Sequence, residues 1–72
     1  EGQWTAWFID GRLTEGYYEN GKKDATWTSW WDHDRTRKEM QGAYRNGKMV
    51  DKWFFYDKNG NLKEIRYFSP DF

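Results

Sequence analysis

Short runs rich in aromatic residues and threonine alternate with polar positions along the chain, and pairs of turn-forming residues separate them. The pairs are Asn-Gly or Asp-Gly, at residues 10–11, 20–21, 46–47 and 59–60. Such pairs accept positive φ angles and join antiparallel strands tightly. No run places apolar residues at i, i+3, i+4 and i+7 over three turns, as an amphipathic helix would. The pattern therefore predicts strands near residues 3–9, 12–19, 26–31, 37–45, 52–56 and 62–68.

A repeated unit indicates how these strands are organised. Tyr-x-Asn-Gly-Lys, four further residues and then Trp occurs twice, starting at Tyr18 and at Tyr44. The matching tryptophans are Trp4, Trp27 and Trp53, which are 23 and then 26 residues apart. Repeats of this length usually contain one supersecondary element each. We expect an all-β fold, an antiparallel up-and-down meander of about six strands built from three β-hairpin repeats. The 72 residues would form a single domain with copies at approximately residues 4–26, 27–52 and 53–72.

The aromatic residues recur in register. Side chains alternate between the faces of a strand, so the three matching tryptophans should form a ladder on one face. A second ladder is expected in the returning strands, from Tyr18, Tyr44 and Phe68. Gly16 and Gly42 each stand two residues before a tyrosine of this second ladder. A glycine there would let a ring from the next strand lie over bare backbone.

A third aromatic set supplies the candidate binding residues, which are Trp7, Trp30 and Tyr56. Each lies three residues after a ladder tryptophan and therefore on the opposite face. The chain has no predicted helix that could cover a second face. Either the sheet coils and closes on itself, or aromatic surface stays open, which is typical of a binding site.

The pattern Gly-x-Tyr-x-Asn-Gly-Lys, followed by Trp and an aromatic residue, resembles the MORN-repeat variant found in many bacterial proteins. It starts at Gly16 and again at Gly42, and the resemblance covers nearly the whole chain. The third copy differs, because Ser69-Pro70-Asp71-Phe72 replaces the Asn-Gly-Lys turn, as a capping unit would. Ala25 and Asp51 stand near the place of the glycine that usually precedes the Trp strand in this family. The resemblance implies a binding or scaffold module. Some members are labelled antitoxins of toxin–antitoxin systems, and other MORN proteins have been linked to membranes.

Composition narrows the classes of function. Twelve basic and twelve acidic residues give a net charge of zero, which argues against a general nucleic-acid binder. Six Trp, five Tyr and five Phe must supply the core, because Leu, Ile and Val together number five. No cysteine is available for a disulfide or a thiolate ligand. No apolar run is long enough to predict a transmembrane helix.

Two clusters carry a weak suggestion of metal binding. Asp32-His33-Asp34 contains the sole histidine, with no second His or Cys to complete a tetrahedral site, so a solvated loop is the favoured interpretation. Residues 57–64 faintly resemble a calcium loop, but position six falls on Leu62 where glycine is required. A hairpin turn around Asn59-Gly60 explains the same residues. We expect no metal and no cofactor.

No catalytic constellation is evident either. Ser29 lies in a strand at a position where the other copies have Ala6 and Phe55. The carboxylates of Glu15 and Glu39 alternate with basic residues, as in cross-strand ion pairs. We therefore expect a protein that is not an enzyme.

The leading hypothesis is a non-enzymatic protein-interaction or self-assembly module, with a protein partner or a second copy of the chain. Carbohydrate binding through aromatic stacking is an alternative, and so is an antitoxin-like inhibitor of a partner protein. Single-stranded nucleic acid, which also stacks on aromatic rings, is the least favoured partner.

Overall fold

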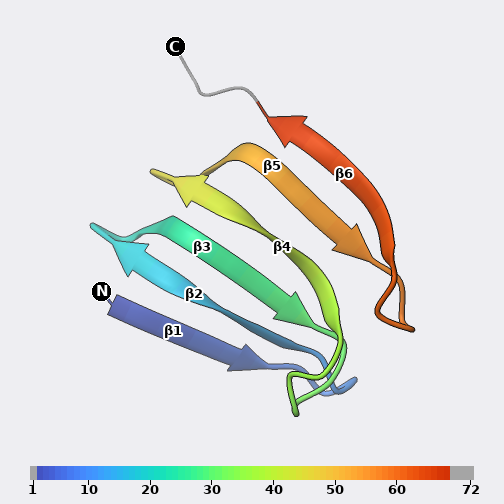
Figure 1. Cartoon of the computed structure of the whole chain (residues 1–72). Coiled ribbons are helices and arrows are strands. Elements are labelled where there is room, and N and C mark those ends of the chain that lie inside the picture. Colours follow the sequence, from blue (N-terminus) through green and yellow to red (C-terminus); the bar gives the residue numbers. More distant parts are fainter. Residues whose placement is uncertain (1, 69–72) are drawn as a thin grey trace.

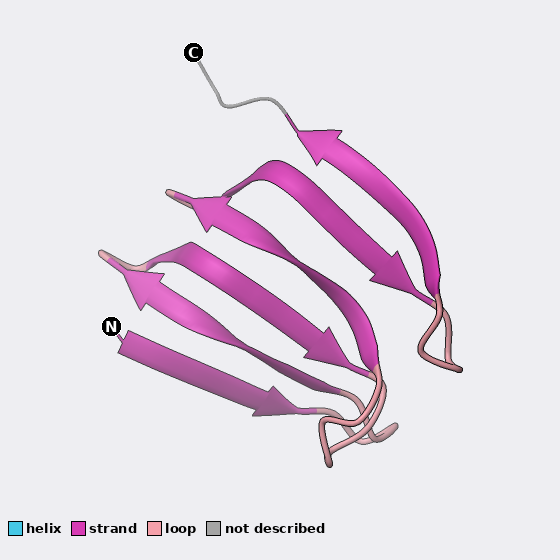
Figure 2. Cartoon of the chain, in the orientation of Figure 1, coloured by secondary structure: helices cyan, strands magenta, loops and turns pink. Residues whose placement is uncertain are grey.

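The computed structural model describes residues 2–68, which form one antiparallel sheet with the strand order β1-β2-β3-β4-β5-β6 (Figure 1). The strands are β1 (Gly2–Trp7), β2 (Leu13–Glu19), β3 (Lys22–Trp30), β4 (Lys38–Arg45), β5 (Lys48–Tyr56) and β6 (Leu62–Phe68). The predicted all-β meander is confirmed, and Figure 2 shows only strands and loops in the described residues. The replaced turn at residues 69–72 lies outside the described residues.

Strands β3 and β5 each begin four residues earlier than predicted. The cause is the pair of two-residue turns that precede them. Both central residues of each turn have positive φ, namely 55° and 77° at Asn20 and Gly21, and 54° and 85° at Asn46 and Gly47. This is the geometry of the tight hairpin turn whose twist matches that of its strands. Pairing therefore resumes at once, through polar residues that resemble a loop in the sequence.

The turns at the other end of the sheet are longer. Phe8 N donates to Arg12 O at 2.9 Å and Asp57 N donates to Asn61 O at 2.9 Å, so each closes a three-residue loop. Asp57 Oδ1 also accepts hydrogen bonds from the backbone N–H groups of Asn59 and Asn61. The predicted hairpin turn around Asn59-Gly60 is confirmed, and the Asp57 carboxylate serves that turn.

The two predicted ladders merge into one row on a single face, with one ring from each strand. In strand order, this aromatic row consists of Trp4, Tyr18, Trp27, Tyr44, Trp53 and Phe68. The centroids of successive rings lie 5.1 to 6.4 Å apart, with interplanar angles of 78° to 89°. Edge-to-face pairs of this kind contribute about 0.5–1.5 kcal/mol each beyond the area they bury.

Two tryptophans of the row are seated on glycine. A Cβ atom added to Gly16 would overlap the indole of Trp27, and one added to Gly42 would overlap the indole of Trp53. The ring from the next strand does lie over bare backbone, as predicted. The indole N–H of Trp27 donates to Tyr17 O and that of Trp53 donates to Ala43 O, both at 3.1 Å. Trp27 and Trp53 are consequently only 3% and 2% exposed.

The sheet stays open, which answers the question that the sequence left unresolved. Strands β1 and β6 lie at opposite margins in Figure 1, and the described residues provide no second layer. The shortest dimension of the molecule is 15 Å. Leu13, on the face opposite the row, is fully buried because it pairs with Trp7 on one side and Trp30 on the other. The core is therefore divided between the two faces.

A strained backbone position precedes each of the three matching tryptophans. Gly2, Ala25 and Asp51 stand two residues before them and have φ angles of 86°, 60° and 62°. The left-handed conformation costs about 1–2 kcal/mol for a residue with a Cβ atom, and Asp tolerates it better than Ala. Only the first of the three positions has the residue that avoids this strain.

We predict that Ala25→Gly increases the free energy of unfolding by about 1 kcal/mol, because glycine adopts the observed φ without strain. Ala43→Gly is the matched control. Ala43 lies in β4 without positive φ, so the same change should destabilise by about 0.5–1 kcal/mol. Urea denaturation measures both, and destabilisation by Ala25→Gly would contradict the argument.

Trp27→Ala should destabilise the fold by about 3–5 kcal/mol, since it removes a buried Trp from the middle of the row. That is comparable with the whole stability of so small a domain. Gly16→Ala should be similarly damaging because it displaces the same ring. Circular dichroism melts are expected to lose their cooperative transition, and a transition near that of the wild type would show that the row is not the core.

Candidate interaction surface

The three candidate binding residues lie in adjacent or nearby strands on the face opposite the aromatic row. Trp7 in β1 and Trp30 in β3 flank Leu13 of β2 in register. Tyr56 is in β5, and β4 separates it from Trp30. The structure thus brings Trp7 and Trp30 to the two sides of one buried leucine and leaves Tyr56 apart from them.

Trp30 and Tyr56 are engaged within the chain. The indole N–H of Trp30 donates to Glu15 Oε2 at 2.9 Å, and Arg35 forms an ion pair with the same carboxylate at 3.0 Å. The hydrogen bond from Arg35, with help from Trp30, lowers the pKa of Glu15. Lys38 Nζ lies 5.9 Å from the centre of the Tyr56 ring. Trp7 is the member of the set that is widely exposed, at 63%.

Further exposed apolar residues gather at strand β1 and the loop that follows it. Besides Trp7, the exposed fractions are 44% for Trp4, 46% for Phe8 and 108% for Ile9. Strand β1 contains no charged residue. Exposed strand edges in natural proteins usually carry charges that prevent pairing with another chain. Strand β1 lacks that protection.

The opposite edge, β6, also exposes Leu62, Ile65 and Tyr67, but charged residues stand between them. It carries the charged residues Lys63, Glu64 and Arg66. Lys52 Nζ lies 5.8 Å from the centre of the exposed Tyr67 ring, and the Arg66 guanidinium lies 5.6 Å from that of Phe55. Near β1, the Arg12 guanidinium lies 5.9 Å from the centre of the Phe8 ring, so a cation also stands over an aromatic ring at that edge.

A hollow of about 330 Å³ lies on the row face. Its lining includes Trp4, Phe8, Met40 and Tyr44. Lys23 Nζ stands over the row, 4.8 Å from the Trp27 ring centre and 5.0 Å from that of Tyr44. Burial raises the pKa of Tyr44. Aromatic side chains line the hollow near β1, and the Lys23 amine lies over the Trp27 and Tyr44 rings.

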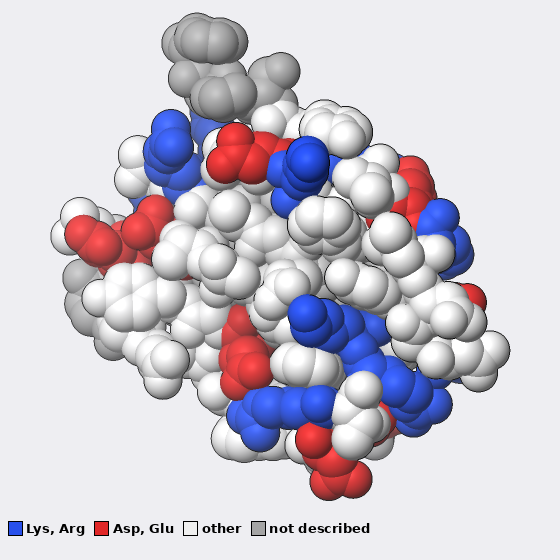
Figure 3. Space-filling view, viewed as in Figure 1, with Lys and Arg blue, Asp and Glu red and all other residues white. Residues whose placement is uncertain are grey.

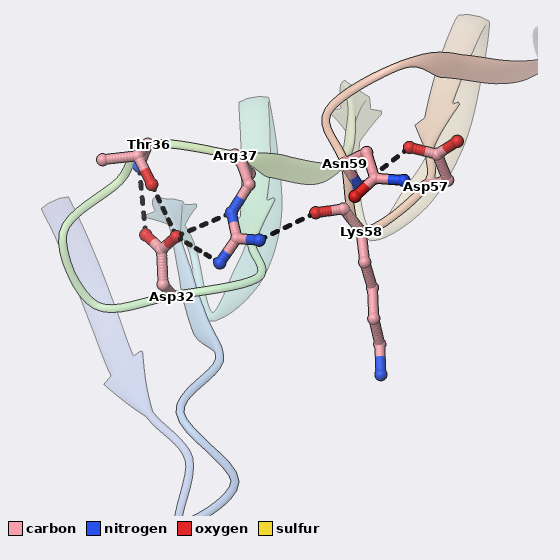
Figure 4. Close-up of polar contacts among 6 residues, drawn as sticks. All are labelled: Asp32, Thr36, Arg37, Asp57, Lys58 and Asn59. Carbon is pink, nitrogen blue, oxygen red and sulfur yellow. Dashed lines mark hydrogen bonds and ion pairs between the residues drawn. The ribbon is translucent and has the colours of Figure 1, made fainter.

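Polar contacts connect the β3–β4 loop to the β5–β6 loop (Figure 4). Asp32 accepts hydrogen bonds from the Thr36 hydroxyl and backbone N–H, and from the Arg37 guanidinium. Arg37 also donates to Lys58 O at 2.9 Å and so joins the β3–β4 loop to the β5–β6 loop. The bonds from Thr36, with Arg37 as a further cause, lower the pKa of Asp32 to about 2.

These contacts define what the acidic residues do. The Asp32 carboxylate stabilises its own loop, and among residues 2–68 no three His, Asp or Glu side chains are grouped to hold a metal ion. Glu39 in β4 pairs with Arg12 at 3.1 Å and Glu15 in β2 pairs with Arg35 at 3.0 Å, but both arginines lie in loops, so these ion pairs join a strand to a loop and are not the predicted cross-strand pairs. Figure 3 shows charges of both signs interspersed over the viewed face.

A second hollow, of about 440 Å³, lies at the loop end between residues with opposite charges. Asp10, Arg12, Trp31, Arg37 and Lys58 line it. The ion pairs and hydrogen bonds of the loops already involve Arg12, Arg37 and Asp10.

Ser29, elsewhere on the sheet, shares a 2.9 Å hydrogen bond with the Thr14 hydroxyl. Its nearest polar neighbour is therefore not a base that could activate it as a nucleophile.

The sequence interpretation missed Trp4 as a surface residue, because it placed Trp4 in the core ladder. The signal that identifies it is its place in the first strand of a meander, where one side has no neighbour.

Comparison of the chain with protein-family models, with curated proteins and with solved structures gives no match. Within the part of the chain that the structure describes, no helix is long and apolar enough to cross a membrane.

The lowered pKa of Asp32 predicts a pH dependence of stability. A depressed carboxyl pKa stabilises the fold above the unfolded value of 3.8, and this contribution is lost as the pH falls toward about 2. Thermal melts between pH 5 and pH 2 should therefore show a smaller loss of Tm for Asp32→Asn than for the wild type. Asp34→Asn, at an exposed position of the same loop, is the control. Parallel Tm curves for Asp32→Asn and the wild type would contradict the assignment.

Proposed function

We propose that the protein is a non-enzymatic interaction module that binds a partner protein through the edge formed by β1 and the loop after it. One observation carries the proposal: four large apolar residues lie close together in β1, which has no charged residue, and in the loop after it. They are Trp4, Trp7, Phe8 and Ile9, all at least 44% exposed. Tryptophan is enriched among the residues that dominate binding energy at protein interfaces.

The contrast between the two edges supports this choice. Lys63, Glu64 and Arg66 occupy β6, whereas β1 has no charged residue, and charged side chains on an edge strand are one way in which proteins prevent unwanted pairing. An exposed apolar edge of β1 is costly to leave in water unless a partner covers it. An antitoxin-like inhibitor, which the resemblance to MORN-type repeats implies, would be one form of this function.

Carbohydrate binding has weaker support. Sugar rings stack on open aromatic faces, but Trp27 and Trp53 are almost fully buried, and successive rings of the row meet edge to face. Among residues 2–68, the largely exposed tryptophans are Trp4 and Trp7 at the edge. The regular row of rings is therefore a poor platform for a chain of sugars.

The test is photo-cross-linking in the cells that produce the protein. A photoreactive residue replaces Trp7 in one variant and His33, exposed in the β3–β4 loop, in the control. We expect one reproducible adduct at position 7 that is absent at position 33, and mass spectrometry should find peptides of a second protein in it. Excess wild-type chain should compete for the partner at least tenfold better than a Trp4→Ala, Trp7→Ala chain. Identical adducts at both positions, or a glycan in place of peptide, would overturn the proposal.

A further inference from the structure

The tryptophans of the aromatic row do not have equivalent surroundings. Trp27 is flanked by Tyr18 from the preceding strand, at 5.3 Å, and by Tyr44 from the following strand, at 6.0 Å. Trp53 likewise lies between Tyr44 and Phe68, at 5.1 and 6.4 Å. Each of these two residues is thus enclosed by rings from both neighbouring strands.

The preceding strand supplies three groups to each enclosed tryptophan. A glycine lies under the indole, the carbonyl of the next residue accepts the indole N–H, and an aromatic ring two residues after the glycine packs against the indole edge. For Trp27 these groups come from Gly16, Tyr17 and Tyr18. The strand before Trp53 supplies the same groups at the same spacing, from residues 42, 43 and 44.

Trp4 has only half of this environment. Tyr18 and Trp27 pack against it at 5.6 and 5.8 Å, both from strands on its β2 side. Within residues 2–68, no strand pairs with the outer side of β1. The exposed fraction of Trp4 is 44%, against 3% and 2% for Trp27 and Trp53.

We propose that β1 binds an added antiparallel strand of a partner protein that carries Gly-x-Tyr or Gly-x-Phe, with the glycine under Trp4. The proposal rests on the proposed function and specifies the partner's chemistry. Backbone hydrogen bonds to the β1 edge supply affinity, as in other cases of strand addition, and the glycine supplies specificity. The carbonyl after that glycine accepts the Trp4 indole N–H, and the aromatic residue extends the row by one ring.

The β6 edge of a second copy does not fit this place. In β6, Arg66 pairs with Trp53 in the way that Gly42 pairs with Trp27 and Gly16 with Trp4. Arg66 therefore stands where a glycine is needed, and Phe68 follows at the aromatic position. Because a Cβ atom at this position overlaps an indole, Arg66 excludes Trp4 of another copy. The added strand therefore needs a glycine at the position that Arg66 occupies in β6.

The first experiment uses a peptide of residues 38–48, which contains Gly42 and Tyr44, added to the wild-type chain. The matched control is the same peptide with Gly42→Ala. Nuclear magnetic resonance of the tryptophan indole N–H groups should show a saturable shift that is largest for Trp4. We expect binding at least tenfold weaker for the alanine peptide and for a Trp4→Ala chain with the original peptide. Equal affinity of the two peptides, or binding that leaves the Trp4 signal unchanged, would overturn the proposal.

The second experiment changes the blocked edge of the chain itself. Arg66→Gly should allow head-to-tail association through β1, whereas Arg66→Ala, which removes the charge but keeps a Cβ atom, should not. Sedimentation velocity should show concentration-dependent association of the glycine variant only, and Trp4→Ala in the same chain should abolish it. Identical behaviour of the two Arg66 variants would contradict the role of glycine, and so would association of the wild type through β1. If Arg66→Gly does not fold, the peptide measurement decides.

Failure of the inference and failure of the proposed function give different results. A protein adduct at position 7 without discrimination between the peptides would leave the interaction function standing and refute the glycine rule. Discrimination between the peptides without a protein adduct in cells would establish the specificity of the β1 edge and refute the proposed function.

Discussion

The structure depends on the contact between an indole and a glycine in the preceding strand. A six-stranded sheet with no covering layer has few places to bury a large side chain. Trp27 and Trp53 lie flat along the sheet, over Gly16 and Gly42, so backbone atoms take the place of a second layer. The carbonyl that accepts each indole N–H satisfies the only polar atom of the ring. Burial of an aromatic ring thus becomes compatible with a molecule 15 Å thick.

This contact explains several features that have no evident connection in the sequence. The glycine must precede the aromatic residue by two positions so that both reach the same face. Strands β2 and β3 change register between Glu15 and Tyr17, and β4 and β5 do so between Gln41 and Ala43, around the seated ring in each case. The positive φ angle two residues before each Trp belongs to the same irregularity.

Much of this arrangement could be predicted from the sequence. The alternation of residues, the Asn-Gly pairs and the repeated unit predicted six strands in order, and the glycine spacing predicted a ring over bare backbone. The early starts of β3 and β5 could not be predicted from composition, because Lys22 and Lys48 become strand residues only through the turns before them. The two predicted ladders form one row because of the direction in which each side chain leans along the sheet. The spacing of residues in the sequence does not determine that direction. Whether the sheet closed on itself was also undetermined, since that depends on its total twist.

The candidate surface was the least predictable part, because position in the sheet decides it more than residue type does. Trp4, Trp27 and Trp53 are equivalent in the repeated unit, yet their exposed fractions differ more than tenfold. Trp30 has the same residue type as Trp7, but Glu15 and Arg35 hold it in place while Trp7 stays open.

The difference in exposure between Trp4 and the other two ladder tryptophans also affects the specificity of the proposed binding. An uncharged edge with exposed tryptophans would be expected to pair without discrimination and to aggregate. A requirement for glycine under the indole limits this hazard, because every other residue carries a Cβ atom that the ring cannot tolerate at that point. Discrimination then arises from steric exclusion of wrong partners as much as from attraction to the right one. The arginine at the equivalent position of β6 applies the same exclusion to the β6 edge of the chain's own copies. An edge that is attractive in composition and restrictive in shape is what the proposed binding role requires.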